Sequence, residues 1–258
     1  MTIYSWNMLY RNRELDRAFA FISHADFDIF CLQEVPEAFL EQLRTLPYAS
    51  SVRLDGERLL STGSVRNYIV TLSKYPITAE KEISFDDYWT AFPLLARLFI
   101  RVMPSRFFSP TRNRGGLAVD VSHKTGASLR IFNLHLVLAH PAWRLKEFGR
   151  AMLERDPAQP TIVCGDFNIL EAAHIAPLNW LLGGRFSDAL RYRRERSVIE
   201  RRFAEHELAN LLAGRITHPL SHSQLDHILV SHSFTIKNAE VLPDRIGSDH
   251  HPVRAEIA

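Results

Sequence analysis

The sequence has only two cysteines, Cys31 and Cys164, and both lie in apolar runs that are typical of buried strands. Two cysteines placed in this way build neither the disulfide framework of a small secreted protein nor a cysteine-rich zinc site. We therefore expect both thiols to be free and to pack as small apolar side chains in a reducing compartment.

Long apolar runs and terminal leaders are also missing. No stretch is long enough to cross a bilayer, and no charged leader precedes the first strand-like run at residues 2–6. The expected location is therefore the cytoplasm. The formal net charge is only +2, which allows an anionic substrate without requiring one.

Repeats, low-complexity tracts and glycine- or serine-rich linkers are absent as well, so nothing in the sequence divides the chain. With 258 residues, of which 46% are hydrophobic, the chain is long enough to bury one large core. We expect a single domain that spans residues 1–258.

Strand-like runs recur throughout the chain, together with hairpin signals and helical stretches. This mixture predicts an α/β (α+β) fold of packed sheets with helices on the outside. A hairpin turn is expected at Lys124-Thr125-Gly126. Strands are expected at 3–6, 27–32, 67–72, 80–85, 117–122, 128–134, 161–164, 226–231, 235–241 and 253–257, and helices at 14–24, 36–46, 143–156, 174–182 and 197–212.

The most informative motif is Gly165-Asp166-Phe167-Asn168, which directly follows a β-branched run at 161–164. A short apolar run that ends in glycine predicts a buried strand followed by a turn. Because side chains alternate along a strand, Asp166 and Asn168 are expected on one face at its tip. A carboxylate and an amide in that position can share one water or one phosphate.

Polar residues follow six separate strand-like runs in the same manner, and this ordered set indicates an active site raised on a rigid scaffold. In this order the motifs resemble the endonuclease/exonuclease/phosphatase family, to which pancreatic deoxyribonuclease and the exonuclease III-type abasic-site endonucleases are related. The resemblance implies a deoxyribonuclease I-like four-layer sandwich, in which two packed mixed β-sheets are flanked by helices, and metal-dependent hydrolysis of phosphoesters. The motifs are Ser5-Trp6-Asn7, Leu32-Gln33-Glu34-Val35, Asn133-Leu134-His135, Gly165-Asp166-Phe167-Asn168, Leu225-Asp226-His227-Ile228 and Ser248-Asp249-His250-His251-Pro252.

The resemblance implies that Glu34 holds a divalent cation, with Asn7 and Asp249 beside it. Mg²⁺ binds few carboxylates and keeps positions for water and phosphate oxygens. Mn²⁺ suits the same oxygen ligands. Taken alone, Glu34 before Pro36 also fits an acidic residue that complements a helix dipole.

The resemblance also assigns catalytic roles. Asp166 would orient and deprotonate the attacking water, and Asn168 would fix that water or a phosphate oxygen. His250 would donate to a non-bridging phosphate oxygen, while Asp226 holds its imidazole in one tautomer. Two alternatives stay open, since Asn168 also fits a helix N-cap and Asp226 a structural cap.

His135 matches a phosphate-contacting histidine of the deoxyribonuclease and sphingomyelinase branches. In the deoxyribonuclease branch this histidine has an acidic partner, and the strand expected to supply one reads Val65-Arg66-Asn67-Tyr68. We therefore expect Asn67 to stand in for the acid. Without the resemblance, a lone histidine in an apolar strand is more often a structural residue.

Substrate choice is expected in loops around the strand ends. Three arginine-rich segments, 10–17, 88–114 and 191–202, suit a nucleic-acid backbone, although glutamates in the last segment also fit a solvated helix. DNA or RNA is therefore the first expected substrate. A membrane phospholipid, cleaved in the manner of a sphingomyelinase, or a small phosphoester is the alternative. No protein partner is implied.

Within residues 88–114, five apolar residues fall at helical spacing: Trp89, Phe92, Leu95, Phe99 and Met103. Pro93 is placed to open a short helix and Pro104 to close it. We expect a helix that covers the core with this face, and a membrane-surface element is the other interpretation. A decayed binding module or a purely structural domain is disfavoured, because nearly all the expected polar residues are present.

Overall fold

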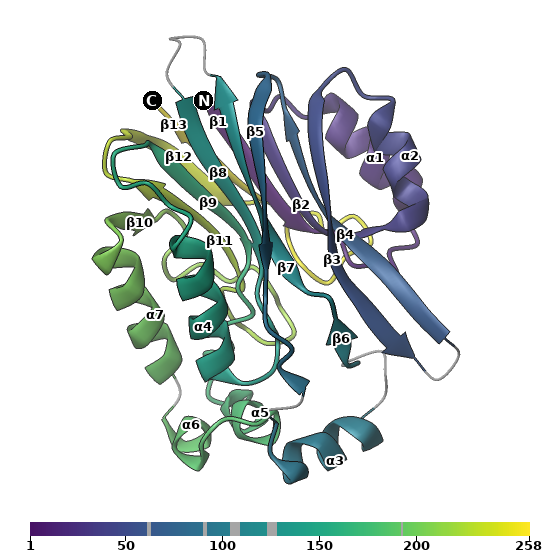
Figure 1. Ribbon diagram of the computed structural model, residues 1–258, viewed down its shortest axis with the longest axis vertical. Coiled ribbons are helices and arrows are strands. Elements are labelled where there is room, and N and C mark those ends of the chain that lie inside the picture. Colours follow the sequence, from purple (N-terminus) through teal and green to yellow (C-terminus); the bar gives the residue numbers. More distant parts are fainter. Residues whose placement is uncertain (61–62, 90–91, 104–108, 123–127, 192) are drawn as a thin grey trace.

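The computed structural model describes residues 1–258 except 61–62, 90–91, 104–108, 123–127 and 192. Two mixed β-sheets pack face to face, and helices cover both outer faces, so that the chain forms four layers (Figure 1). The predicted four-layer α/β sandwich is therefore confirmed.

The first sheet has seven strands in the order β12-β13-β1-β2-β4-β3-β6. Only β1 and β2 run parallel, and all the other neighbours are antiparallel. The strands are β1 (Thr2–Asn7), β2 (Ile29–Pro36), β3 (Ala49–Leu60), β4 (Gly63–Ser73), β6 (Thr111–Arg112), β12 (Ile236–Val241) and β13 (Val253–Ile257).

The second sheet has six strands in the order β10-β11-β9-β8-β7-β5. Here β8 and β9 are the parallel pair. The strands are β5 (Ile77–Ser84), β7 (Gly115–Ser122), β8 (Ser128–His135), β9 (Thr161–Asp166), β10 (Leu208–Asn210) and β11 (Asp226–Ser231).

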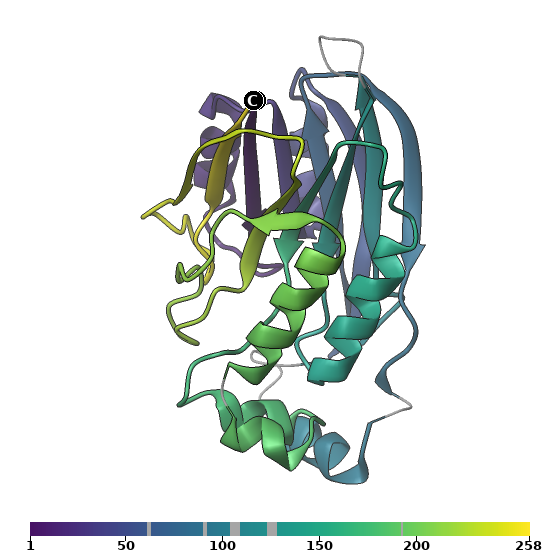
Figure 2. The ribbon, with the colours of Figure 1, turned by 90° about the vertical axis from the view of Figure 1, so that its left-hand side faces the viewer.

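Helices α1 (Leu15–His24) and α2 (Glu37–Arg44) cover the first sheet, while α4 (Pro141–Met152) and α7 (Arg194–Glu205) cover the second (Figure 1). The short helices α3 (Leu94–Val102), α5 (Ala176–Leu181) and α6 (Phe186–Leu190) gather at one end of the molecule, as Figures 1 and 2 show from two sides. Within the described part of the chain, no helix combines the length and the apolar character needed to cross a membrane.

The core between the sheets is built from β-branched and other apolar side chains of both inner faces. Cys31 from β2 and Cys164 from β9 belong to it, and both thiols are buried and free, as predicted. Burial of these alternating side chains fixes the register of each strand, because a slip of one residue would turn every apolar side chain outward.

One strand was missed, and two predicted helices differ clearly from the structure. Strand β3 was not predicted at all, since its sequence mixes charged and small residues and lacks a clean alternation. The helix expected at 197–212 ends at Glu205, because Leu208–Asn210 pairs with the edge of β11 as β10. The helix expected at 174–182 is shorter, Ala176–Leu181. The predicted hairpin turn at 124–126 lies outside the described residues, but β7 and β8 do pair antiparallel on either side of it.

The short helix predicted after Pro93 is present as α3, and four of the five apolar residues expected on the covered face pack in one cluster with it: Trp89, Phe92, Phe99 and Met103. Ala96 and Ile100 face inward, whereas Leu95, which was expected on the covered face, is exposed. The residue expected to close the helix, Pro104, lies outside the described part of the chain.

Candidate active site

The ends of the two parallel strand pairs bring the predicted residues together. Asn7 ends β1, and Glu34 lies near the end of β2 in the same sheet. In the facing sheet, His135 at the end of β8 is the register partner of Asp166 at the end of β9. One cavity of about 450 Å³ is lined by seven of the eight predicted residues: Asn7, Glu34, His135, Asp166, Asn168, Asp249 and His250. The eighth, Asp226, lies behind His250 and contacts it.

Asp166 lies between two imidazoles. Its Oδ2 is 3.7 Å from Nε2 of His135 and 3.7 Å from Nε2 of His250. The same oxygen accepts a hydrogen bond of 2.9 Å from Nδ2 of Asn7, and Oδ1 accepts one of 2.8 Å from the backbone N–H of Asn168. Burial raises the pKa of Asp166, and the nearby carboxylate of Asp226 raises it further. Together these two effects outweigh the two histidines, which would lower the pKa.

His250 is held by Asp226, whose Oδ2 lies 2.8 Å from Nδ1 of the imidazole. Burial alone would lower the pKa of His250, but the carboxylates of Asp226 and Asp166 outweigh it and raise the pKa to about 10. The other ring nitrogen, Nε2, is therefore left to face Asp166 as a proton donor. The hydroxyl of Thr217 fixes this corner, because it accepts the backbone N–H of Asp226 at 2.9 Å.

The partner of His135 is Asp55, and the expectation of Asn67 in that place is wrong. Nδ1 of His135 lies 2.7 Å from Oδ2 of Asp55, on the unpredicted strand β3. Asn67 donates its amide to the same oxygen at 2.7 Å, so it supports the acid instead of replacing it. The register shifts at Asp55, between Leu54 and Gly56, and such a bulge re-aims a side chain.

Glu34 also lies at an irregularity, since the register between β2 and β4 shifts between Leu32 and Val35. Its backbone is left-handed with φ of 53°, a rare conformation for a residue other than glycine. The carboxylate accepts the backbone N–H of Tyr10 at 3.1 Å and Nη2 of Arg58 at 2.6 Å. The negative charge of Glu34 thus faces the cavity, and the first turn of α2 receives its acidic residue from Glu37 instead.

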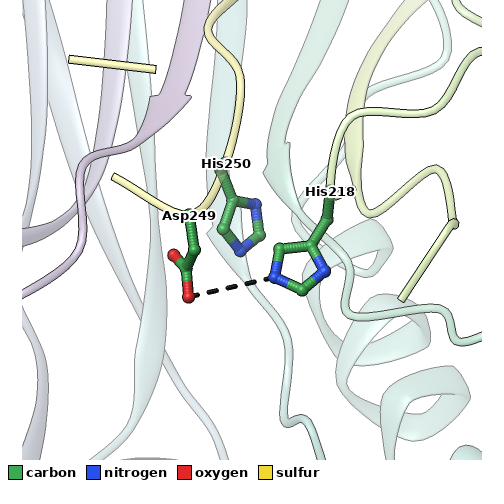
Figure 3. Close-up of side chains that lie close together, drawn as sticks. All are labelled: His218, Asp249 and His250. Atoms are coloured by element: carbon green, nitrogen blue, oxygen red, sulfur yellow. Dashed lines mark ion pairs between the residues drawn. The ribbon is translucent and has the colours of Figure 1, made fainter. Parts of the chain in front are cut away.

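Asp249 and His250 meet a third histidine, His218, which the sequence did not single out (Figure 3). Nε2 of His218 is 3.8 Å from Oδ2 of Asp249, and its ring lies 4.8 Å from that of His250. Burial would raise the pKa of Asp249, but His218 and His250 outweigh it and hold the pKa well below the ordinary value. Asp249 is therefore a carboxylate at neutral pH.

Asn168 caps no helix, because the next helix begins only at Ala176. Its Nδ2 donates to the carbonyl of Leu136 at 2.9 Å, and its backbone is left-handed with φ of 54°. The N-cap alternative is thus wrong, and Asn168 instead joins the tight turn after β9 to the end of β8.

Buried polar contacts hold the two halves of the site in register. Nε2 of Gln33 in the first sheet donates to Oδ1 of Asn133 in the second at 2.7 Å. Gln33 immediately precedes Glu34, and Asn133 lies two residues before His135. Nδ2 of Asn133 also donates to the carbonyl of Val70 in the first sheet at 3.0 Å, so these bonds favour one alignment of the two sheets, although Oε1 of Gln33 has no hydrogen-bond partner.

The family model for endonuclease/exonuclease/phosphatase proteins matches residues 4–250. The chain belongs to this family. The predictions of the family and of a phosphoester hydrolase are therefore confirmed.

Solved structures of this fold cover nearly the whole chain. An endonuclease/exonuclease/phosphatase from Beutenbergia cavernae has a TM-score of 0.70 and 17% identity, covering 100% of this chain and 71% of its own. A mannosyl-6-phosphatase from Bacteroides thetaiotaomicron has a TM-score of 0.57 and 20% identity, covering 100% and 99%. ANGEL2, a 2',3'-cyclic phosphatase, has a TM-score of 0.61 and 14% identity, covering 99% and 94%. At these identities the likeness shows the fold alone, and comparison with curated proteins gave no match.

The donor atoms of this family member fit an oxygen-liganded divalent cation. The cavity offers the carboxylates of Glu34, Asp166 and Asp249 and the side-chain amide of Asn7, whereas the two cysteines are buried in the core. Each carboxylate has about four lone-pair positions, so the two hydrogen bonds to Glu34 leave room for a cation. Among the described residues, two groups have ligand atoms close enough together to hold an ion: His218 with Asp249 and His250, and Asp166 with Asp226 and His250. Glu34 and Asn7 belong to neither group, although they line the same cavity.

Three residues of the candidate site were missed from the sequence: Asp55, Arg58 and His218. Asp55 and Arg58 lie on β3, for which no strand was predicted. His218 precedes a proline in a loop that gives no periodic signal. The one usable signal was Asp55-Gly56, a dipeptide that is typical of turns and bulges.

Proposed function

We propose that this protein hydrolyses a phosphodiester with the help of a divalent cation, Mg²⁺ or Mn²⁺, and that residues 1–258 form one catalytic domain. The supporting observation is the cavity at the strand ends, where Glu34, Asp166 and Asp249 face His135 and His250. Carboxylates that gather beside two partnered imidazoles supply both a cation site and proton donors for an anionic substrate.

In the reaction a water adds to phosphorus, and one ester P–O bond breaks. The products are an alcohol and a phosphate monoester, and the proton lost by the water balances the proton gained by the leaving oxygen. Asp166 is the group that orients the water and takes its proton, because its raised pKa makes it a better base than an ordinary aspartate. Asn7 and the backbone of Asn168 hold both of its oxygens in place.

His250 and His135 each place Nε2 3.7 Å from Oδ2 of Asp166. Asp226 and Asp55 bind the Nδ1 atoms and keep both rings charged, so each ring can donate to an oxygen of the phosphate. When bound, the cation supplies Lewis-acid stabilisation of the developing charge. Glu34 and Asp249 are the residues that would hold it, with the Oδ1 of Asn7, which has one lone pair beyond its bond from Leu9, close by.

A nucleic acid was the first substrate expected from the sequence, and one observation in the structure supports it as a candidate. The guanidinium of Arg58 lies 4.4 Å from the centre of the Tyr10 ring, and both residues line the cavity beside Glu34. An arginine and an aromatic ring side by side suit a phosphate with a stacked base.

The test is metal-dependent turnover of bis(4-nitrophenyl) phosphate, a soluble phosphodiester, by the wild type and by Asp166→Asn. We expect turnover to fall by a factor of about 10² to 10⁴ in the variant, and to vanish in EDTA and return with Mg²⁺ or Mn²⁺. The matched control is Asp120→Asn, which removes a carboxylate that pairs with Arg130 in the second sheet, outside the cavity. Undiminished turnover by a folded Asp166→Asn protein would refute the proposal. Single-stranded DNA and RNA in the same assay test the nuclease prediction.

A further inference from the structure

Helix α3 turns an apolar face to solvent. Leu94 is 73% exposed, Leu98 49% and Val102 81%, and Leu95 beside them is 55% exposed. The orientation of the helix is fixed, because Ala96 and Ile100 on its other side pack in a cluster with residues of the β8–α4 segment. Among the described residues, therefore, nothing covers this outer face.

More apolar side chains are exposed at the same end of the molecule. Phe186 and Leu190 of α6 are 59% and 69% exposed, and Figures 1 and 2 both place α6 and α3 at this end. Leu220, in the loop before β11, is 70% exposed and lines the same cavity as Leu178 of α5. Single exposed apolar residues are ordinary on a protein surface, but a group of them on neighbouring elements marks a site of contact.

The apolar surface continues into the cavity that holds the catalytic residues. Met103, directly after α3, lines this cavity, as do Leu178 of α5 and Leu182 behind it. Leu220 both lines the cavity and is exposed, so it stands at the rim. The cavity is thus polar at the strand ends and apolar toward α3 and α5, which suits a substrate with a phosphate at one end and an apolar group at the other.

The charges around this surface are mainly positive, and the acidic residue of α6, Asp188, lies 4.0 Å from Arg194. Helix α3 contains two arginines and no acidic residue. The segment after α5 adds Arg185, Arg191, Arg193 and Arg194, all of them exposed. Arginines next to an apolar face match the anionic headgroups of a lipid surface, which attract cationic side chains while the apolar ones enter the interface.

We propose that this end of the protein, formed by α3, α6 and Leu220, docks on an anionic phospholipid membrane, and that the phosphoester cleaved in the cavity is carried by a lipid. The second part rests on the proposed function. Docking places the cavity mouth against the bilayer surface, so that a lipid headgroup reaches Asp166 and His250 while its apolar part stays against Leu178, Leu182 and Leu220. The binding energy then comes from apolar side chains that are already exposed, on a helix whose other side packs against the protein.

The experiment compares the wild type with Leu94→Gln/Leu98→Gln/Val102→Gln. Glutamine keeps helix propensity and removes the apolar surface. The matched control is Leu153→Gln/Ile236→Gln, which changes two exposed apolar residues away from α3. Flotation with vesicles of phosphatidylcholine plus phosphatidylglycerol, and of phosphatidylcholine alone, measures binding. Release of water-soluble phosphate from phosphatidylcholine, phosphatidylglycerol and sphingomyelin vesicles measures lipid cleavage, and bis(4-nitrophenyl) phosphate measures the site itself.

We expect the wild type and the control to float with the mixed vesicles, and the triple variant to bind roughly ten-fold or more weakly. The triple variant should keep the turnover of the soluble diester and lose that of the vesicle lipid. A wild type that cleaves the soluble diester but binds no vesicles overturns the docking surface and leaves the proposed function intact. Vesicle binding without cleavage of any of the three lipids overturns the substrate class. Loss of RNA cleavage by the triple variant, without vesicle binding by the wild type, would assign this face to nucleic acid. If the soluble diester is not cleaved with any cation, the proposed function itself fails.

Discussion

Replacement of Asp55 by asparagine tests whether a carboxylate that was invisible in the sequence controls His135. Oδ2 of Asp55 is shared by His135, by Asn67 and, at 3.3 Å, by the backbone N–H of Glu34. Burial would raise the pKa of Asp55, but His135 outweighs it and lowers the pKa. For His135 burial would lower the pKa, but Asp55 outweighs it and raises the pKa. The pair is thus a buried carboxylate and imidazolium.

Asp55→Asn keeps the shape and the hydrogen-bond acceptor but removes the charge. A charge-assisted hydrogen bond contributes about 1.5–3 kcal/mol and a neutral one about 0.5–1.5 kcal/mol, so the free energy of unfolding should fall by about 1–2 kcal/mol. The loss depends on pH. Because the pKa of His135 is raised in the folded state, its contribution is complete below the unfolded value of about 6.5 and disappears as the pH rises through the folded value. Because the pKa of Asp55 is lowered, its contribution disappears only in acid, below about pH 4.

The measurement is urea-induced unfolding at about pH 5.5 and about pH 8.5, with kcat for the soluble diester alongside. The difference between wild type and Asp55→Asn should be larger at the lower pH, and kcat should fall by a factor of about 10–100, as is usual when a supporting partner of a site residue is removed. Asp120→Asn is again the control, because its partner Arg130 stays charged over this range and its loss should not depend on pH. An equal loss at both pH values together with an unchanged kcat would show that Asp55 does not set the state of His135.

Three further predictions follow from single contacts. Gly165→Ala should lower the free energy of unfolding by about 3 kcal/mol or more, because a Cβ there would lie 1.8 Å from the carbonyl oxygen of Leu134. At Gly149 in α4 a Cβ would meet no atom within 4 Å, so Gly149→Ala should raise the free energy of unfolding by about 0.5–1 kcal/mol. Urea-induced unfolding of both variants measures the two changes. Burial and Arg196 lower the pKa of His227, so below about pH 6.5 the unfolded chain binds one proton more than the folded chain at this residue. The free energy of unfolding should therefore fall by up to about 1.4 kcal/mol for each unit by which the pH decreases below that value. His227→Gln should reduce this slope, and an unchanged slope would contradict the prediction. Glu34→Gln should weaken Mg²⁺ binding in calorimetry about ten-fold or more while Glu37→Gln, in the exposed first turn of α2, should not, and equal affinities would remove Glu34 from the cation site.

Much of the site could be predicted from the sequence because its residues follow recognisable strands. Asn7, Glu34, His135 and Asp166 each come at or near the end of a short β-branched or apolar run. Local periodicity identifies such runs, and the rule that strand ends meet at one edge of a sheet then gathers their polar residues. The order of the motifs along the chain predicted the family, and the family in turn predicted the four-layer fold.

What the sequence could not supply depends on contacts between distant segments. Asp55 reaches His135 only because β3 pairs with β4 and bulges at that residue, and register of this kind is set by packing across the sheet. The predicted end of α7 was wrong for the same reason. The residues Leu208–Asn210 have a helical sequence pattern, but they pair with the edge of β11 and form a strand.

Helix α3 shows most directly what the sequence alone does not determine. Its sequence, LLARLFIRV, is apolar almost all round, so periodicity alone offers several faces for burial. The cluster with Val137, Ala139 and Leu182 buries Ala96 and Ile100 and leaves Leu94, Leu98 and Val102 outside. The sequence determined that this segment is an apolar helix with arginines. Only the tertiary structure decided which side faces solvent, because burial of a side chain depends on what lies opposite it and not on its neighbours along the chain.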